Sequence, residues 1–194
     1  MNRKISTAIF LTSISSILFF SCKKSDPSPA PANPCTGLSI AVTTSATSNT
    51  PCQPANGSII VNASGSSGYT YSINGGNFQT NNNFTGLNAG TYNIIVKDAN
   101  GCASSAQTAT ISNAAAGPNF TNVKNIVTLR CGSCHLNGGS DGGVNFDNPC
   151  NIVAKWDRIN TRCVTQGNMP PQGLNTTEKS QITAWVNAGH GYTN

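Results

Sequence analysis

The amino-acid sequence predicts two folded modules, an all-β sandwich followed by a small all-α domain, on an exported N-terminal segment. Three observations indicate this organisation. Apolar residues alternate with a period of two in short runs within residues 35–113, as in half-buried strands. After residue 118 the apolar period becomes that of an α-helix. A proline-rich segment, which is expected to be a semi-rigid spacer, separates the β module from an apolar N-terminal stretch.

Residues 1–21 predict an export signal, with two basic residues followed by an uncharged, mostly apolar stretch over residues 5–20. At 16 residues the stretch is too short for a transmembrane anchor, which needs about 20. The sequence "FFSC" resembles the lipobox of bacterial lipoproteins, which implies lipidation of Cys22. The alternative is an ordinary signal peptide with a chance cysteine. Residues 22–34 would then tether the protein to the lipid bilayer of a Gram-negative envelope, in the outer membrane, facing the periplasm or the cell surface.

The composition does not suit a nucleic-acid-binding protein. Charged residues make up 9% of the chain, against about 25% in typical domains. Loss of the signal leaves nine basic and six acidic residues, a net charge of +3. Eight cysteines in an exported chain predict oxidised or ligand-bound sulfur. The acidic residues are scattered and no Ser-His-Asp arrangement can be argued, so we predict no catalytic residues and no hydrolytic activity. We expect the chain not to be an enzyme, with a redox activity as the alternative left open.

The β module is predicted over residues 35–113. Its alternating runs are residues 38–44, 57–64, 69–75, 90–98 and 107–112. The stretch "GLNAGTYNIIVKDANGC" is similar to the SprB-type repeats of bacterial surface proteins. That resemblance, over about residues 50–110, implies an immunoglobulin-like sandwich that serves as a spacer. Cys35, Cys52 and Cys102 are three, so at most one internal disulfide can form, and the sequence does not choose the pair.

Residues 114–118 are expected to be a hinge, and three helices are predicted in residues 119–194. The first begins with Asn119 as its cap. The second begins with Asn148 as cap and Pro149 in the first turn. The third begins with a capping box and ends before Gly189. The predicted apolar helix faces are Phe120, Val123, Ile126 and Val127; Ile152, Val153, Trp156 and Ile159; and Ile182, Trp185 and Val186. Three short helices form a small core, which an apolar cofactor would help to stabilise.

The sequence "RCGSCHL" places a histidine directly after a Cys-x-x-Cys motif, the pattern for covalent haem attachment. Two thiols would meet the two vinyl groups of the haem, and His135 could then bind the iron. Met169, 34 residues later, is the only methionine besides Met1. Its thioether in "GNMPP" is the candidate second axial ligand. His190 is a competing ligand, but a histidine after a helix more often interacts with the helix C-terminus.

With these residues, positions 119–194 resemble the small class I c-type cytochromes. The resemblance implies one covalent haem c attached through Cys131 and Cys134, with His135 as the proximal and Met169 as the distal ligand. The short interval between His135 and Met169 and the extra cysteines depart from that family.

The extra cysteines, Cys150 and Cys163, predict a disulfide that closes a ring of about 14 residues, worth about 3 kcal/mol. The main alternative to haem is a zinc site made by these two with Cys131 and Cys134. The 12 residues between the second pair fit a zinc knuckle badly. A thioredoxin-like dithiol is less favoured, since no parallel sheet is predicted around the motif.

The sequence therefore predicts a lipid-anchored electron-transfer protein with an all-β immunoglobulin-like sandwich and a small all-α cytochrome c domain. Its partners would be envelope redox proteins that donate or accept electrons. The alternative from another functional class is a surface adhesin in which the haem domain is a sensor or stabiliser.

Overall fold

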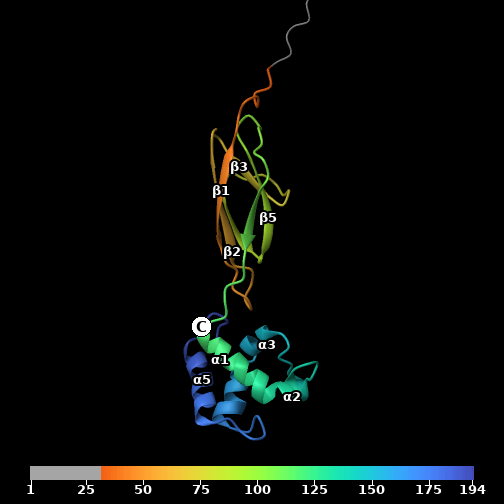
Figure 1. The fold of residues 1–194 in the computed structure, drawn as a ribbon, viewed down its shortest axis with the longest axis vertical. Coiled ribbons are helices and arrows are strands. Elements are labelled where there is room, and N and C mark those ends of the chain that lie inside the picture. The colour runs from red at the N-terminus through yellow and green to blue at the C-terminus, as the bar shows by residue number, and fades with distance from the viewer. Residues whose placement is uncertain (1–31) are drawn as a thin grey trace, which may run out of the picture. The chain divides into compact units, whose positions relative to one another are not determined.

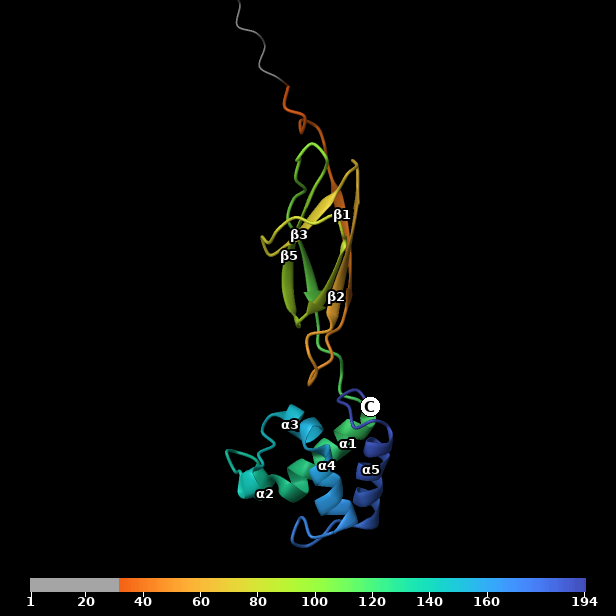
Figure 2. The same cartoon turned by 180° about the vertical axis from the view of Figure 1, so that it is seen from behind.

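The computed structural model describes residues 32–194, so the predicted signal, Cys22 and most of the tether lie outside the described residues. Six strands form two antiparallel sheets of three strands each (Figures 1 and 2). One sheet has the order β1 (Ala41–Thr47), β2 (Gly57–Ser64) and β4 (Asn83–Leu87). The other has the order β3 (Thr70–Ile73), β5 (Gly90–Lys97) and β6 (Gln107–Ile111). The sequence had indicated every strand except β4.

The period-two alternation sets which side chains of the strands are buried. In β2, Ile59 and Val61 have no exposed surface, whereas Ile60 between them is 41% exposed. The pairing of Ser45 with Ile60 and of Ile59 with Phe84 keeps that alternation in register. Buried apolar side chains of both sheets form one cluster together with Ile40, which directly precedes β1: Ile40, Ile59, Val61, Tyr71, Ile94, Val96, Ala109 and Ile111.

The predicted fold class, an immunoglobulin-like all-β sandwich followed by an all-α domain, is wrong. The described residues form two small sheets and a set of short helices, a mixed α and β fold without a large sandwich. Alternation reveals that a strand is half-buried, but not how many strands join one sheet. Here each sheet stops at three strands.

The helical part begins with α1 (Pro118–Ile126), which continues as a π-helical turn over Val127–Cys131 and as α2 (Gly132–His135). A 3₁₀ turn follows at Asp141–Gly143. Next come α3 (Pro149–Ala154), α4 (Trp156–Ile159) and a second π-helical segment, Asn160–Thr165. The last helix is α5 (Thr176–Asn187). None of the helices within residues 32–194 is long and apolar enough to cross a membrane.

Two of the three predicted helix caps are confirmed. The Asn148 side chain accepts from the Cys150 N–H, and Asn175 and Glu178 form the capping box of α5. The cap predicted at Asn119 is wrong, because the cap of α1 is Gly117, two residues earlier, and the helix begins at Pro118. Pro118 suits a first helical position, since its ring fixes a helical φ and its missing N–H needs no partner there.

The helices share a second buried cluster around α1 and α5, which lie side by side in both views (Figures 1 and 2). Phe120 and Trp185 are fully buried, with ring centroids 6.1 Å apart. The C-terminus returns to the start of α1, where the Phe120 N–H donates to the carbonyl oxygen of Asn194. The predicted apolar faces are confirmed, since all their residues belong to this cluster or pack against it.

Four of the seven described cysteines form two disulfides, and neither is the predicted Cys150–Cys163 bond. Cys35 pairs with Cys102, and Cys52, in the loop after β1, pairs with Cys150 at the start of α3. The prediction of a Cys150–Cys163 bond is therefore wrong. The prediction relied on the short separation of Cys150 and Cys163 in the sequence. In the folded chain Cys150 instead lies beside Cys52, 98 residues away in the sequence. Cys163 is a buried free thiol, 7% exposed.

Candidate functional site

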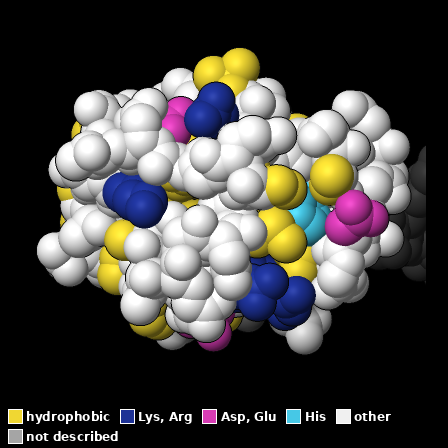
Figure 3. Space-filling view, turned by 90° about the horizontal axis from the view of Figure 1, so that it is seen from below, with side chains coloured by type: hydrophobic (Ala, Val, Ile, Leu, Met, Phe, Trp, Pro, Cys, Tyr) yellow, Lys and Arg dark blue, Asp and Glu magenta, His cyan; other side chains and the backbone are white. Residues whose placement is uncertain are grey.

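A cavity of about 350 Å³ opens on the surface of the helical part and brings together all four predicted haem residues. Cys131, Cys134, His135 and Met169 each line it. Figure 3 shows the face with a histidine among hydrophobic side chains and basic side chains on one border. The apolar walls include Ile126, Val127, Val144, Phe146, Ile159 and Ile182. Residues that are 34 positions apart in the sequence thus share one mostly apolar space.

His135 is the last residue of α2, and its imidazole is held in place by contacts with Val144 and Phe146. Its Nδ1 lies 2.8 Å from the carbonyl oxygen of Val144, and the Phe146 ring packs against it edge-on with centroids 5.6 Å apart. Because a carbonyl oxygen only accepts hydrogen bonds, Nδ1 carries the proton and donates. The Nε2 lone pair is therefore free to bind a metal. No pattern in the sequence indicated Val144 as the residue that orients the histidine.

The two thiols of the motif differ in their surroundings. Cys134 is exposed in α2, whereas Cys131 is half-buried at the end of the π-helical turn, next to Cys163. A hydrogen bond with the Cys163 thiol, together with burial, raises the pKa of Cys131. The raised pKa favours the protonated form of the Cys131 thiol. Sequence reasoning had placed Cys163 in a disulfide and so missed its contact with the attachment motif.

Met169 lies in the loop between the second π-helical segment and α5, and its side chain is 37% exposed. Its backbone N–H donates to the carbonyl oxygen of Arg162 at 3.2 Å, and the N–H of Asn168 donates to the same oxygen at 3.0 Å. The Gly173 N–H then donates to the Pro170 carbonyl at 2.7 Å, which closes a turn directly after Met169. Backbone hydrogen bonds thus hold the loop on both sides of Met169, to the Arg162 carbonyl at Met169 itself and within the 170–173 turn after it.

Three arginines and one aspartate also line the cavity: Arg130, Arg158, Arg162 and Asp141. Arg158 donates from Nη2 to the Gly142 carbonyl at 3.1 Å. Arg158 and Arg162 are four residues apart across two helical segments. A spacing of four residues brings two side chains to one face of a helix. The positions of Arg158 and Arg162 in the sequence could therefore have predicted that both line the same side of the cavity. The excess of positive charge suits carboxylate groups at the edge of an apolar ligand.

No family model, curated protein or solved structure matched this chain. The interpretation of the site therefore depends on its own residues.

His190, the competing axial ligand, does not line the cavity. Its ring stacks on Trp156 with centroids 4.2 Å apart and an interplanar angle of 8°, and it meets Trp185 edge-on. The structure therefore separates His190 from the Cys-x-x-Cys-His motif and leaves Met169 as the second candidate ligand in the cavity.

The four-cysteine zinc site of the alternative interpretation is not assembled. Cys150 is bonded to Cys52, so it cannot supply a thiolate beside Cys131 and Cys134. Within residues 32–194 no group of three or more His, Cys, Asp or Glu side chains is placed to hold a metal ion. The set that does converge is two thiols, an imidazole with a free Nε2 and a thioether. This set fits a covalently held haem, as do the apolar walls.

Proposed function

We propose that residues 119–194 hold one covalently attached haem c and that the protein carries electrons in the cell envelope. The observation that supports this most directly is the convergence of Cys131, Cys134, His135 and Met169 on one cavity. A zinc site or a redox dithiol would not require a methionine at that place.

Each of these residues has a definite role in the proposal. Cys131 and Cys134 would form the two thioether links, and His135 would bind the iron through Nε2 while Val144 holds the Nδ1 proton. Met169 would supply its thioether as the second protein ligand, and a thioether raises the reduction potential relative to a second histidine. When bound, the haem supplies an iron that exchanges one electron between Fe(III) and Fe(II).

The remaining lining residues explain how the chain would accommodate the rest of the group. The apolar side chains of the cavity would exclude water from the macrocycle, and their burial against it would favour binding. Arg158 and Arg162 would face the two propionate carboxylates. If His135 and Met169 both bound the iron, no ligand position would be left for a substrate, which favours an electron carrier over an enzyme.

The location and partners belong to the same proposal. Lipidation of Cys22 would hold the chain on a Gram-negative outer membrane, and the SprB-type segment would act as a spacer. Donors and acceptors would be other redox proteins of the envelope.

The experiment is expression of the full chain in the periplasm of a bacterium that carries the haem-attachment proteins. The purified chain is expected to weigh one haem more than the polypeptide and to retain the haem under denaturing conditions. The Cys131→Ala, Cys134→Ala double variant should lose it, and Cys163→Ala, the matched control, should keep it. A wild-type protein without covalent haem, or with zinc in its place, would refute the proposal.

A further inference from the structure

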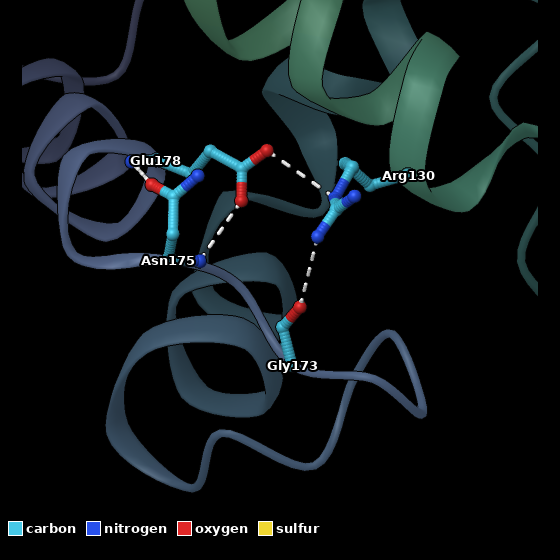
Figure 4. Close-up of polar contacts among 4 residues, drawn as sticks. All are labelled: Arg130, Gly173, Asn175 and Glu178. Atoms are coloured by element: carbon cyan, nitrogen blue, oxygen red, sulfur yellow. Dashed lines mark hydrogen bonds and ion pairs between the residues drawn. The ribbon is translucent and has the colours of Figure 1, made fainter.

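Arg130, the residue directly before the Cys-x-x-Cys-His motif, connects the attachment segment to the methionine loop. Its Nε lies 3.2 Å from Oε1 of Glu178, and its Nη2 lies 3.4 Å from the carbonyl oxygen of Gly173. Figure 4 shows the guanidinium between these two groups. One side chain thus spans two segments that are 43 residues apart in the sequence.

Glu178 is itself fixed, which makes it a firm partner for Arg130. Its Oε2 accepts from the Asn175 N–H at 2.9 Å, and its own N–H donates to the Asn175 side chain at 2.9 Å. This capping box holds the carboxylate at the start of α5, and its side chain is only 18% exposed. One carboxylate oxygen of Glu178 caps the helix and the other contacts Arg130. Because the capping box already orders the Glu178 side chain, forming the ion pair loses little further conformational entropy of that side chain.

Gly173 transmits the contact to Met169. The 170–173 turn is closed by the Gly173 N–H and the Pro170 carbonyl, and Met169 directly precedes that turn. Most of the loop is exposed, and Pro170 and Leu174 are its buried residues. The Arg130 contact therefore adds an anchor after Met169 that complements the Arg162 carbonyl before it.

We propose that Arg130 is a positioning residue that holds the Met169 loop closed over the cavity and so stabilises the bond between the Met169 sulfur and the haem iron. This inference depends on the proposed haem site and extends it. A thioether is a weak, neutral ligand, so the fraction of molecules with Met169 bound depends on how firmly its loop is held. Arg130 acts through that loop and does not touch the iron.

The test is a titration of the ferric holoprotein with imidazole, which binds the iron only when Met169 has left. The apparent association constant of imidazole is its intrinsic constant multiplied by the fraction of molecules in which Met169 has left the iron. Arg130→Ala is expected to tighten imidazole binding about 2- to 5-fold, the range for one partly exposed ion pair. Arg130→Lys should recover part of the effect, because an ammonium can pair with Glu178 but lacks the second donor arm.

Two further variants separate positioning from charge and from general stability. Glu178→Gln keeps an acceptor for the helix cap and removes the ion pair, so it should tighten imidazole binding in the same direction. Lys124→Ala, an exposed basic residue on α1, makes the same change in charge and should leave the affinity unchanged. Urea unfolding followed by circular dichroism reports the global stability of each variant. The change in imidazole affinity of Arg130→Ala should be larger than the change in any variant with an equal loss of unfolding free energy.

Different outcomes contradict the role of Arg130 and the proposed haem-binding function. Wild-type affinity in Arg130→Ala, or an equal shift in Lys124→Ala, overturns the positioning role while covalent haem and Met169 ligation stand. A wild-type protein that lacks covalent haem overturns the proposed function and this inference together.

Discussion

The imidazole Nδ1 of His135 lies 2.8 Å from the carbonyl oxygen of Val144, and this hydrogen bond determines which ring nitrogen can bind a metal. Val144 belongs to the loop that follows α2. The Asp147 carboxylate closes that loop by accepting from the backbone N–H groups of Asn137 and Gly138 and from the Asn145 side chain. The orientation of His135 is therefore linked to an exposed carboxylate outside the cavity.

The first prediction concerns Asp147, whose three hydrogen bonds lower its pKa below the ordinary 3.8, most strongly the one from Gly138. A lowered pKa in the folded state stabilises the fold above the unfolded pKa, and that contribution is lost as the pH falls through the folded pKa. Asp147→Asn should therefore be less stable than wild type at neutral pH, with a difference that disappears in acid. Urea unfolding over this pH range measures it.

The control for this prediction is Asp157→Asn, which removes an exposed acid whose side chain has no hydrogen bond to the described residues. An equal loss in both variants would point to net charge instead of the 137–147 loop. A pH-independent difference for Asp147→Asn would contradict the linkage.

The second prediction is that Met169 is the distal ligand. Sulfur bound to ferric iron gives a weak absorption near the red edge of the visible spectrum, which wild-type protein should show and Met169→Ala should lack. The haem should stay attached in Met169→Ala, because Cys131 and Cys134 hold it independently. The potential should fall, since a thioether favours the reduced iron. Ferric spectra and a redox titration measure both effects.

His190→Ala is the matched test of the competing ligand. Since His190 stacks on Trp156 outside the cavity lining, the spectrum and potential should stay close to those of wild type. Loss of the charge-transfer band in His190→Ala, or its persistence in Met169→Ala, would reverse the assignment.

The third prediction concerns the cysteines outside the attachment motif. Peptide mapping of the unreduced holoprotein should find Cys35 linked to Cys102 and Cys52 linked to Cys150, with Cys163 alone alkylated after denaturation. The Cys52→Ser, Cys150→Ser double variant should lose about 2–4 kcal/mol of unfolding free energy, because that bond closes a long loop. A Cys150–Cys163 peptide would contradict the structure.

The fourth prediction concerns Cys22, which lies outside the described residues. Cys22→Ser should release the protein from the membrane fraction, and wild type should incorporate labelled lipid. A variant that still fractionates with membranes, beside a wild type that takes up no label, would show that the lipobox resemblance is accidental.

Local patterns in the sequence were reliable where the interacting groups are close along the chain. The Asn175–Glu178 capping box and the cap at Asn148 were predicted because hydrogen bonds at a helix start join residues two or three apart. The same holds for the alternation in β2, where backbone geometry alone sends neighbouring side chains to opposite faces. The Cys-x-x-Cys-His motif is local too, so its residues could be named from spacing.

Contacts between distant segments depend on the path of the whole chain, and spacing does not encode that path. Cys150 bonds to Cys52 across a separation of 98 residues, Cys163 meets Cys131, and Arg130 reaches Gly173. Which strands share a sheet is settled in the same way, and the predicted sandwich was wrong for that reason. The four candidate haem residues could thus be named from the sequence, whereas only the tertiary structure brings Met169 to the cavity of His135 and orients the histidine on Val144.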